Sequence, residues 1–374
     1  MTKATVLWLL RLALKIFTIC LYIITLVSAY GGYFNPAWWT FPAIGVLFFP
    51  YFAMFTLIVS AVWLIRRKLV IGCVGIGVLL ACGPTFPEAM PFRFGTEPID
   101  KSKTFRMVTF NSLHMEDRKL KGRNSNDDTA GANFNRSLHF LIHSGADFIC
   151  LQELYGFNTH EISKKYKAQV DSLEKIYPYI SADGWREVEF VSKYPFTMTD
   201  VDLGPDVKYG SCAAYRLTID GNKLTVINVH LPSYLLSESE RKIITGAKGK
   251  EGVKNSIKEF EGSVYRKMRN AFASRAQVSK AIAEFAEKEE GNVIVCGDFN
   301  DVPGSWTYRN FTKRGFEDAY AQTGFGHIIT YNDHLMWFHI DQILYKGDMV
   351  PLYVRKERMN ASDHFPLVAE FEFL

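Results

Sequence analysis

Uncharged, apolar runs dominate the first quarter of the chain. No Asp, Glu, Lys, Arg or His lies between Ile16 and Ile65, and this run is more than twice the roughly 20 residues that cross a bilayer once. A turn rich in Gly, Asn and Pro, with aromatic residues beside it, divides the run near residues 31–39. A second uncharged run, residues 69–87, follows a basic triplet. The pattern predicts three transmembrane helices, at about residues 7–30, 41–65 and 69–84.

The basic residues around these runs predict their orientation. Lys3, Arg11 and Lys15 flank the first span, and the triplet at 66–68 separates the second span from the third. Because Lys and Arg are enriched in cytoplasmic loops, we expect a multi-pass protein of the inner or plasma membrane whose residues after 84 are extracytoplasmic. A cleaved signal peptide is one alternative, although the first run is long for that purpose. Lipidation of Cys82 is another, since Leu-Leu-Ala-Cys-Gly resembles a bacterial lipoprotein cleavage site.

The pattern changes after the apolar runs. Residues 85–103 are rich in Pro and polar groups, which is typical of a linker. From 104 to 374, short β-branched runs alternate with amphipathic helical patterns such as Val264–Lys288. An Asp-Gly-Asn turn at 220–222 between two such runs indicates a hairpin. Hairpins mixed with helices favour packed sheets covered by helices over a doubly wound parallel sheet.

The charge of the chain is unevenly distributed. The chain carries 43 Lys+Arg and 39 Asp+Glu, but residues 1–103 hold nine basic and three acidic groups, and residues 104–374 hold 34 and 36. A strongly basic nucleic-acid-binding domain is therefore disfavoured. Within the slightly acidic part, residues 241–280 hold 11 basic groups and three acidic ones. This segment is either a footprint for nucleic acid or anionic lipid, or a solvated insertion.

Polar residues stand where the predicted strands end. Side chains at one end of a sheet commonly converge on a site that a rigid scaffold holds in place. Their oxygen donors, with no thiolate among them, suit Mg²⁺ or Mn²⁺, and a His oriented by an Asp supplies acid–base capacity. This chemistry suits the hydrolysis of a phosphate ester. The candidates are Asn111, Glu153, His230, Asp298, Asn300, Asp341, Asp363 and His364.

The same residues carry a resemblance to a known family. The ordered motifs are Thr-Phe-Asn111, Leu-Gln-Glu153, Ser192-Lys-Tyr-Pro, Asn-Val-His230-Leu, Gly-Asp298-Phe-Asn300, Ile-Asp341-Gln-Ile-Leu and Ser-Asp363-His364. This series resembles the endonuclease/exonuclease/phosphatase superfamily, to which pancreatic-type deoxyribonuclease belongs, over essentially all of 104–374. The resemblance implies an α/β fold: a four-layer α/β-sandwich of two central, mostly antiparallel sheets flanked by helices, preceded here by the all-α transmembrane segment.

The resemblance also implies a metal site. The sequence departs from the family pattern at two places. Glu153 would be the principal ligand of Mg²⁺ or Mn²⁺, with Asn111 and Asp363 completing or flanking the site. The strand that begins at Glu187 reads Glu-Val-Glu-Phe-Val where relatives often have Gly-Val-Ala-Ile. Glu187 or Glu189 either lines the site or faces solvent, and we expect solvent. His339 stands where many relatives have Arg, and we expect it at the surface or in a substrate loop.

The remaining candidates receive catalytic roles by the same motif match. Asp298 would orient the nucleophilic water, and Asn300 would hold a phosphate oxygen. His364 would act in acid–base or transition-state stabilisation while Asp341 fixes its tautomer. His230 would contact the phosphate and assist the leaving group.

These observations together predict a membrane-tethered, Mg²⁺- or Mn²⁺-dependent phosphoester hydrolase, and we expect a phosphodiesterase. The partners would be the lipid bilayer and a phosphoester substrate, either a lipid headgroup or a nucleic acid; no protein partner is evident. The alternative is a non-catalytic, membrane-anchored binding or scaffold protein with the same fold.

Overall fold

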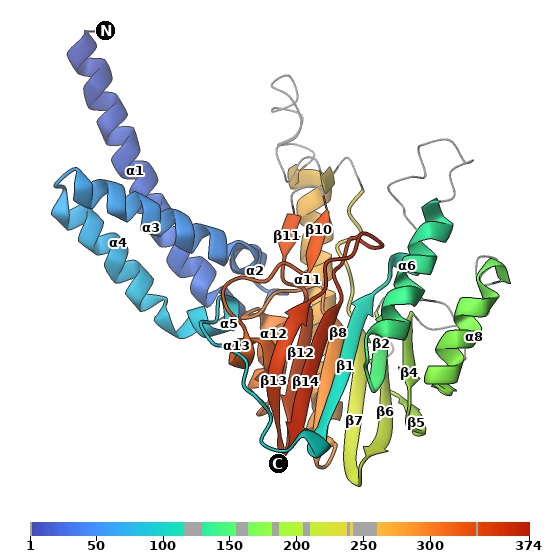
Figure 1. Ribbon diagram of the computed structural model, residues 1–374. Coiled ribbons are helices and arrows are strands. Elements are labelled where there is room, and N and C mark those ends of the chain that lie inside the picture. The colour runs from blue at the N-terminus through green and yellow to red at the C-terminus, as the bar shows by residue number, and fades with distance from the viewer. Residues whose placement is uncertain are drawn as a thin grey trace.

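The N-terminal helices project from one side of a sheet-containing body (Figure 1). The computed structural model describes residues 2–115, 129–154, 164–181, 187–204, 210–237, 240–241, 260–333 and 336–374. Its N-terminal helices are α1 (Lys3–Tyr30), α2 (Thr40–Leu47), α3 (Phe49–Ile65), α4 (Leu69–Ala81) and the short α5 (Phe86–Ala89), with a 3₁₀ turn, η1 (Gly31–Tyr33), after α1.

One of these helices is by itself long and apolar enough to span a membrane. The apolar segment Lys3–Tyr33 has a mean hydropathy of 2.2 and is long enough to cross a bilayer. The pair α2 and α3 is bent by 70°, and the pair formed by α4 and residues 83–89 is bent by 44°. The structure thus supports one spanning helix near the N-terminus, and up to three if each bent pair is a single span. The second and third spans stay a prediction.

Hydroxyl and indole groups join α1 to α3 in antiparallel alignment. Trp63 Nε1 donates to Thr18 Oγ1 at 3.0 Å, and the Thr25 and Thr56 hydroxyls lie 2.8 Å apart. Lipid tails are as apolar as helix surfaces, so the hydrophobic effect does not drive helices together in a membrane. Hydrogen bonds of this kind contribute to their association instead. Cys82, at the end of α4, is fully buried.

Two six-stranded sheets form the centre of the body. The first has the order β13-β14-β1-β2-β4-β3 and the second β5-β6-β7-β8-β12-β9. The pairs β1–β2 and β7–β8 are parallel, and the other described pairs are antiparallel. A separate hairpin joins β10 (Tyr331–Asp333) to β11 (Met336–Phe338). The strands of the first sheet are β1 (Thr104–Asn111), β2 (Phe148–Gln152), β3 (Tyr179–Ile180), β4 (Val188–Ser192), β13 (Met349–Lys356) and β14 (Leu367–Phe373). Those of the second are β5 (Phe196–Asp200), β6 (Ser211–Ile219), β7 (Asn222–His230), β8 (Asn292–Asp298), β9 (Glu317–Asp318) and β12 (Asp341–Lys346).

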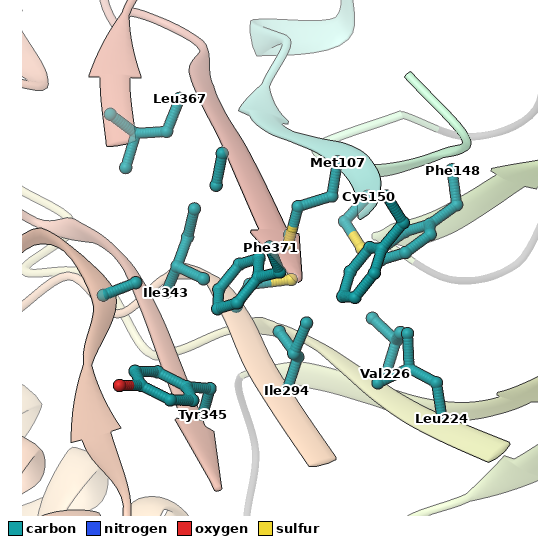
Figure 2. Packing of buried hydrophobic residues seen from close by; sticks show 14 of the residues in the cluster. Met107, Phe148, Cys150, Leu224, Val226, Ile294, Ile343, Tyr345, Leu367 and Phe371 are labelled. Carbon is teal, nitrogen blue, oxygen red and sulfur yellow. The ribbon is translucent and has the colours of Figure 1, made fainter. Parts of the chain in front are cut away.

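Alternation along the strands creates three apolar layers. In β2, Phe148 and Cys150 face the other sheet, where they meet Val226 and Ile294 of the second sheet (Figure 2). The neighbouring Ile149 and Leu151 face outward, because successive side chains of a strand point to opposite faces. The outward faces are covered by helices: α6 (Thr129–His143) and α8 (Lys167–Ile176) on the first sheet, α11 (Tyr265–Lys288) and α12 (Trp306–Thr312) on the second. The predicted four-layer α/β-sandwich is confirmed.

The N-terminal helices and the segment after them contact this sandwich directly. The carboxylate of Glu88 lies 2.9 Å from the guanidinium of Arg309, and the backbone N–H of Arg93 donates to the carbonyl of Gly324 at 2.8 Å. A Cβ on Gly32 would lie 1.8 Å from the carbonyl oxygen of Gly304, so only glycine permits this approach. The predicted linker therefore lies along the sandwich.

Candidate active site

Strand register brings the candidate residues to one end of both sheets. Asp298, the last residue of β8, pairs with His230 of β7 and with Asp341, the first residue of β12. In the other sheet, Asn111 ends β1 beside Gln152, and Glu153 follows β2 directly. Because β12 runs antiparallel to β8, the start of one strand meets the end of the other, which places a polar row at a single sheet edge.

An amide joins the carboxylates of the two sheets. Asn111 Nδ2 donates to Asp298 Oδ2 at 2.9 Å and to Glu153 Oε1 at 3.2 Å. Asp298 is only 1% exposed. Burial raises the pKa of Asp298, and the neighbouring His364 opposes that rise. The site thus contains a deeply buried carboxylate at its centre, surrounded by hydrogen-bond donors.

His364 is held by Asp341. Its Nδ1 donates to the two carboxylate oxygens of Asp341 at 2.9 and 3.1 Å, and its Nε2 lies 3.7 Å from Asp298 Oδ2. Burial lowers the pKa of this imidazole, but Asp341 and Asp298 outweigh burial and hold the pKa well above its ordinary value. This pairing fixes the ring in the orientation in which Nε2 faces the centre of the site.

His230 forms a second pair, and here the sequence-based expectation was wrong. Glu187 keeps 40% of its side chain exposed, but its Oε2 lies at the site, 3.1 Å from His230 Nδ1. His230 Nε2 then lies 3.7 Å from Glu153 Oε1 and 3.8 Å from Asp298 Oδ2. Burial lowers the pKa of His230, but Glu187 and Asp298 raise it above its usual value. Glu189 is buried as well.

The register of β4 explains this error. Gln152 pairs with Val188, and the backbone N–H of Glu153 donates to the carbonyl of Glu187 at 2.7 Å. Glu187 therefore stands beside Glu153 at the same sheet edge. The signal in the sequence was the departure from the expected Gly-Val-Ala-Ile pattern, which marked the position without revealing its partner.

Asn300 and Asp363 complete the set of predicted residues. The backbone N–H of Asn300 donates to Asp298 Oδ1 at 2.7 Å, and its Nδ2 donates to the carbonyl of Leu231 at 2.9 Å. Asp363 lines a cavity together with Glu153, Asp298, Asn300 and His364, and burial raises its pKa. The structure brings all eight predicted residues together, while their individual roles stay predictions.

Backbone strain is concentrated at these positions. Glu153 and Asn300 have φ of 53° and 49°, a region that residues other than glycine adopt rarely and mostly at functional sites. Gly297, directly before Asp298, has φ of 137°, and a Cβ there would lie 2.0 Å from the carbonyl oxygen of Val229. Glycine thus lets β7 and β8 deliver His230 and Asp298 side by side.

Two buried amides beneath the site tie the sheets together. Gln152 Nε2 donates to Asn228 Oδ1 at 2.6 Å, and Asn228 Nδ2 donates to the carbonyls of Leu151 and Glu189 at 3.0 and 2.8 Å. In the sequence both amides stand within one or two residues of a candidate residue, in Leu-Gln-Glu153 and Asn-Val-His230-Leu. In the structure they support the site from below.

The chemistry of the donors fits a hard divalent cation. Ligand atoms of Asp298, Asp341 and His364 lie within 4.8 Å of one another and could hold a metal ion. Asp341 and His364 bind each other, however, while Glu153 Oε1 accepts from Asn111 Nδ2 and Asn111 Oδ1 accepts from the backbone N–H of Leu113. Which of these residues would hold a metal stays a prediction. The thiols of Cys150 and Cys296 lie in the core between the sheets.

His339 and Arg275 of the basic segment lie apart from this cluster. His114 and Arg241 do not: His114 Nε2 lies 3.6 Å from Glu153 Oε2, and Arg241 lines a cavity together with Asp298 and His364. His339 is buried, which makes the expected surface or loop role wrong; it packs in the strand connection directly before Ile340. The middle of the basic segment, 242–259, falls outside the described residues. In its described part, Arg275 is fully buried, with its guanidinium over the Tyr234 ring and 3.5 Å from Asp301, so this cation serves the core.

Comparisons with known proteins identify a family model and several solved structures that are similar to the chain. The model of the Endonuclease/Exonuclease/phosphatase family matches residues 109–364. Solved structures similar to the chain include a humanized D. rerio TDP2 (16% identity, 72% of this chain and 99% of that chain, TM-score 0.47) and an endonuclease/exonuclease/phosphatase from Bacteroides vulgatus (16%, 72% and 99%, 0.47). A third is an endonuclease/exonuclease/phosphatase from Beutenbergia cavernae (12%, 72% and 72%, 0.47). Among curated proteins, none matches the chain.

Proposed function

The chain belongs to the endonuclease/exonuclease/phosphatase family, and from this premise we propose that it is a membrane-tethered, divalent-metal-dependent phosphoester hydrolase acting on phosphodiesters. One observation carries the proposal: two imidazoles, each oriented by its own carboxylate, point Nε2 at Asp298 from two sides. A scaffold protein has no need of such an arrangement, which concentrates buried charge at a cost to stability.

Each residue then has a task that its position supports. Asp298 orients the attacking water and accepts its proton, and Asn300 holds a phosphate oxygen. His364 and His230 donate from Nε2 to the developing charge on the phosphoryl group and on the leaving oxygen. A Mg²⁺ or Mn²⁺ ion on Glu153, with Asn111 and Asp363 at its flanks, would neutralise phosphate charge when bound.

The membrane arrangement supports an extracytoplasmic catalytic domain. The contacts of Thr18 with Trp63 and of Thr25 with Thr56 align α1 antiparallel to α3, and this alignment brings Lys15 level with Arg66. The start of α1 and the turn between α3 and α4 lie away from the sandwich (Figure 1), and these two segments carry the basic residues at 3, 11, 15 and 66–68. Under the positive-inside rule this end of the helices is cytoplasmic. We propose a membrane anchor over 1–84, a linker over 85–103 and a catalytic domain over 104–374.

The test is an activity assay on the full chain in detergent. Bis(p-nitrophenyl) phosphate, phosphatidylinositol, sphingomyelin and plasmid DNA are supplied with Mg²⁺ or Mn²⁺, or with EDTA. We expect hydrolysis that EDTA abolishes and added metal restores. Asp298→Asn should lower kcat about 10³-fold, within the range that positioned acid–base groups contribute. Asp348→Asn, at an exposed turn, is the matched control and should behave as wild type.

Two results would contradict the proposal. One is that none of the four substrates is hydrolysed with either metal, which would favour the scaffold alternative. The other is equal activity in Asp298→Asn and wild type.

A further inference from the structure

The cavity above the catalytic residues has two chemically distinct sides. It measures about 400 Å³, and its polar side contains Glu153, Asp298, Asn300, Asp363 and His364. Much of the remaining lining, here called the apolar wall, comes from Leu47, Phe48, Met268, Met336, Phe338 and Ile340, which pack in one apolar cluster. A cavity of this size lies within the roughly 300–1,000 Å³ that small-molecule sites occupy. Reaction at phosphorus uses only the polar side.

The membrane segment itself supplies part of the apolar wall. Leu47 ends α2, and Phe48 stands at the 70° bend between α2 and α3. Phe48 contacts Phe338 edge to face, with ring centroids 5.6 Å apart. Leu47 belongs to one buried cluster with Met268 of α11. A catalytic cavity in a soluble domain would need no such contribution.

Further contacts hold the N-terminal helices against the sandwich. The hydroxyl of Tyr51, on α3, donates to the carbonyl of Trp337 on β11, and Phe41 stacks on Tyr265 with centroids 5.2 Å apart. Because α3 leads away into the predicted membrane segment, the cavity lies close to the level at which the helices leave the sandwich.

Exposed apolar side chains surround this junction. Trp38 is 89% exposed and Trp337 is 42% exposed, while Leu235, which lines the cavity, is 59% exposed. Trp and Tyr are enriched where a protein crosses the membrane–water interface. Leu235 thus gives the cavity an exposed apolar edge, while Trp38, in the connection before α2, and Trp337, on β11, are exposed aromatic side chains outside its lining.

Charge argues against a nucleic acid in this cavity. Of the described residues that line it, Arg241 is the one that carries a Lys or Arg side chain, and Asp333 lies 3.0 Å from it. A polyanion depends on several Lys or Arg contacts to its phosphates. A single phosphate attached to an apolar group matches the lining better.

We propose that the apolar wall is a subsite for the hydrocarbon chain of a membrane lipid phosphoester. The inference rests on the proposed function and extends it. The headgroup phosphoester lies over Asp298, and the chain runs along Phe48 and Leu47 toward the bilayer. The enzyme thereby selects substrates by the apolar group next to the phosphate, and the membrane segment takes part in recognition as well as in tethering.

The test uses p-nitrophenyl phosphodiesters that differ only in one alkyl group: methyl, butyl or hexyl, at concentrations below self-association. Burial of one methylene is worth about fourfold in affinity. If the wall covers about three methylenes, kcat/KM should rise on the order of 50-fold from the methyl to the hexyl ester. The readout is this hexyl-to-methyl ratio, measured on the full chain in detergent.

Variants assign the ratio to the wall. Phe48→Ser combined with Leu235→Ser should bring the ratio to within about threefold of one, since both side chains are partly exposed and can be shortened without opening the core. Ile99→Ser, an exposed apolar position outside the cavity, should keep the wild-type ratio. The variants share one detergent, so partition into micelles affects them equally.

Three outcomes overturn the inference. A wild-type ratio near one refutes the subsite while the phosphodiesterase stands. Cleavage of an oligonucleotide with a kcat/KM above that of the hexyl ester does the same. Hydrolysis of none of the esters removes the proposed function, and the subsite with it.

Discussion

His364 and His339 lie 25 positions apart in the sequence, and both are buried, yet their protonation is driven in opposite directions. The pKa of His364 stands well above its ordinary value, because Asp341 and Asp298 outweigh the effect of burial. The pKa of His339 falls to about 3, because burial and the neighbouring His327 both disfavour its charged form. Burial alone therefore makes a neutral structural imidazole, and only a carboxylate partner converts it into a charged donor.

His230 lies between these two cases. Its carboxylate partner, Glu187, has 40% of its side chain exposed, whereas Asp341 is almost completely buried. A water-exposed partner interacts more weakly, because solvent screens the charge. The three residues thus form a series in which the strength of the carboxylate contact decides what the imidazole can do.

Removing the strongest contact should give the largest effect. Asp341→Asn keeps the shape of the side chain but can present an N–H to His364 Nδ1, which favours the wrong tautomer. We expect kcat on a phosphodiester to fall about 10³-fold, with little change in KM. An unchanged melting temperature separates this loss from unfolding, and a kcat within threefold of wild type would show that Asp341 does not position the imidazole.

The neutral, buried His339 should affect how the unfolding free energy depends on pH. The unfolded chain binds a proton at His339 near pH 6.5, while the folded chain does so only near pH 3. This contribution is therefore complete above pH 6.5 and is lost as the pH falls toward 3. Between pH 7 and pH 5, His339→Leu should lose about 2 kcal/mol less unfolding free energy than wild type.

Denaturant unfolding at the two pH values measures this difference. His139→Leu, at an exposed position of α6, serves as the control and should follow wild type. If His339→Leu and wild type lost the same unfolding free energy between pH 7 and pH 5, His339 would not titrate as its burial requires.

The exposed partner should give the smallest effect. Glu187→Gln should lower kcat about tenfold, since the exposed carboxylate contributes less than a buried one, and the loss should shrink further at high salt. Glu290→Gln, an exposed glutamate elsewhere, is the control. A loss as large as that of Asp341→Asn would remove the distinction between the two pairs.

Local patterns in the sequence were sufficient for the fold and for the set of candidate residues. Short apolar runs such as Phe148–Leu151 predict strands, and the ordered motifs from Asn111 to His364 predicted the family and the four-layer sandwich. The strand prediction depends on residues that are neighbours in the chain. The family prediction depends on the order of motifs along the chain, which is read without knowledge of the tertiary structure. The sequence was less informative about the membrane segment, where apolar length alone does not show whether a bent pair such as α2 and α3 is one span.

Pairings between distant residues were decided by tertiary structure alone. The sequence identifies Glu187 as unusual, but only the register of β4 against β2 sets it beside His230. It likewise shows Leu47 and Phe48 as members of an apolar run, and only the docking of α2 on α11 turns them into a wall of the catalytic cavity. The reason is physical: composition and periodicity report what each segment must bury, whereas register and docking decide which buried groups meet.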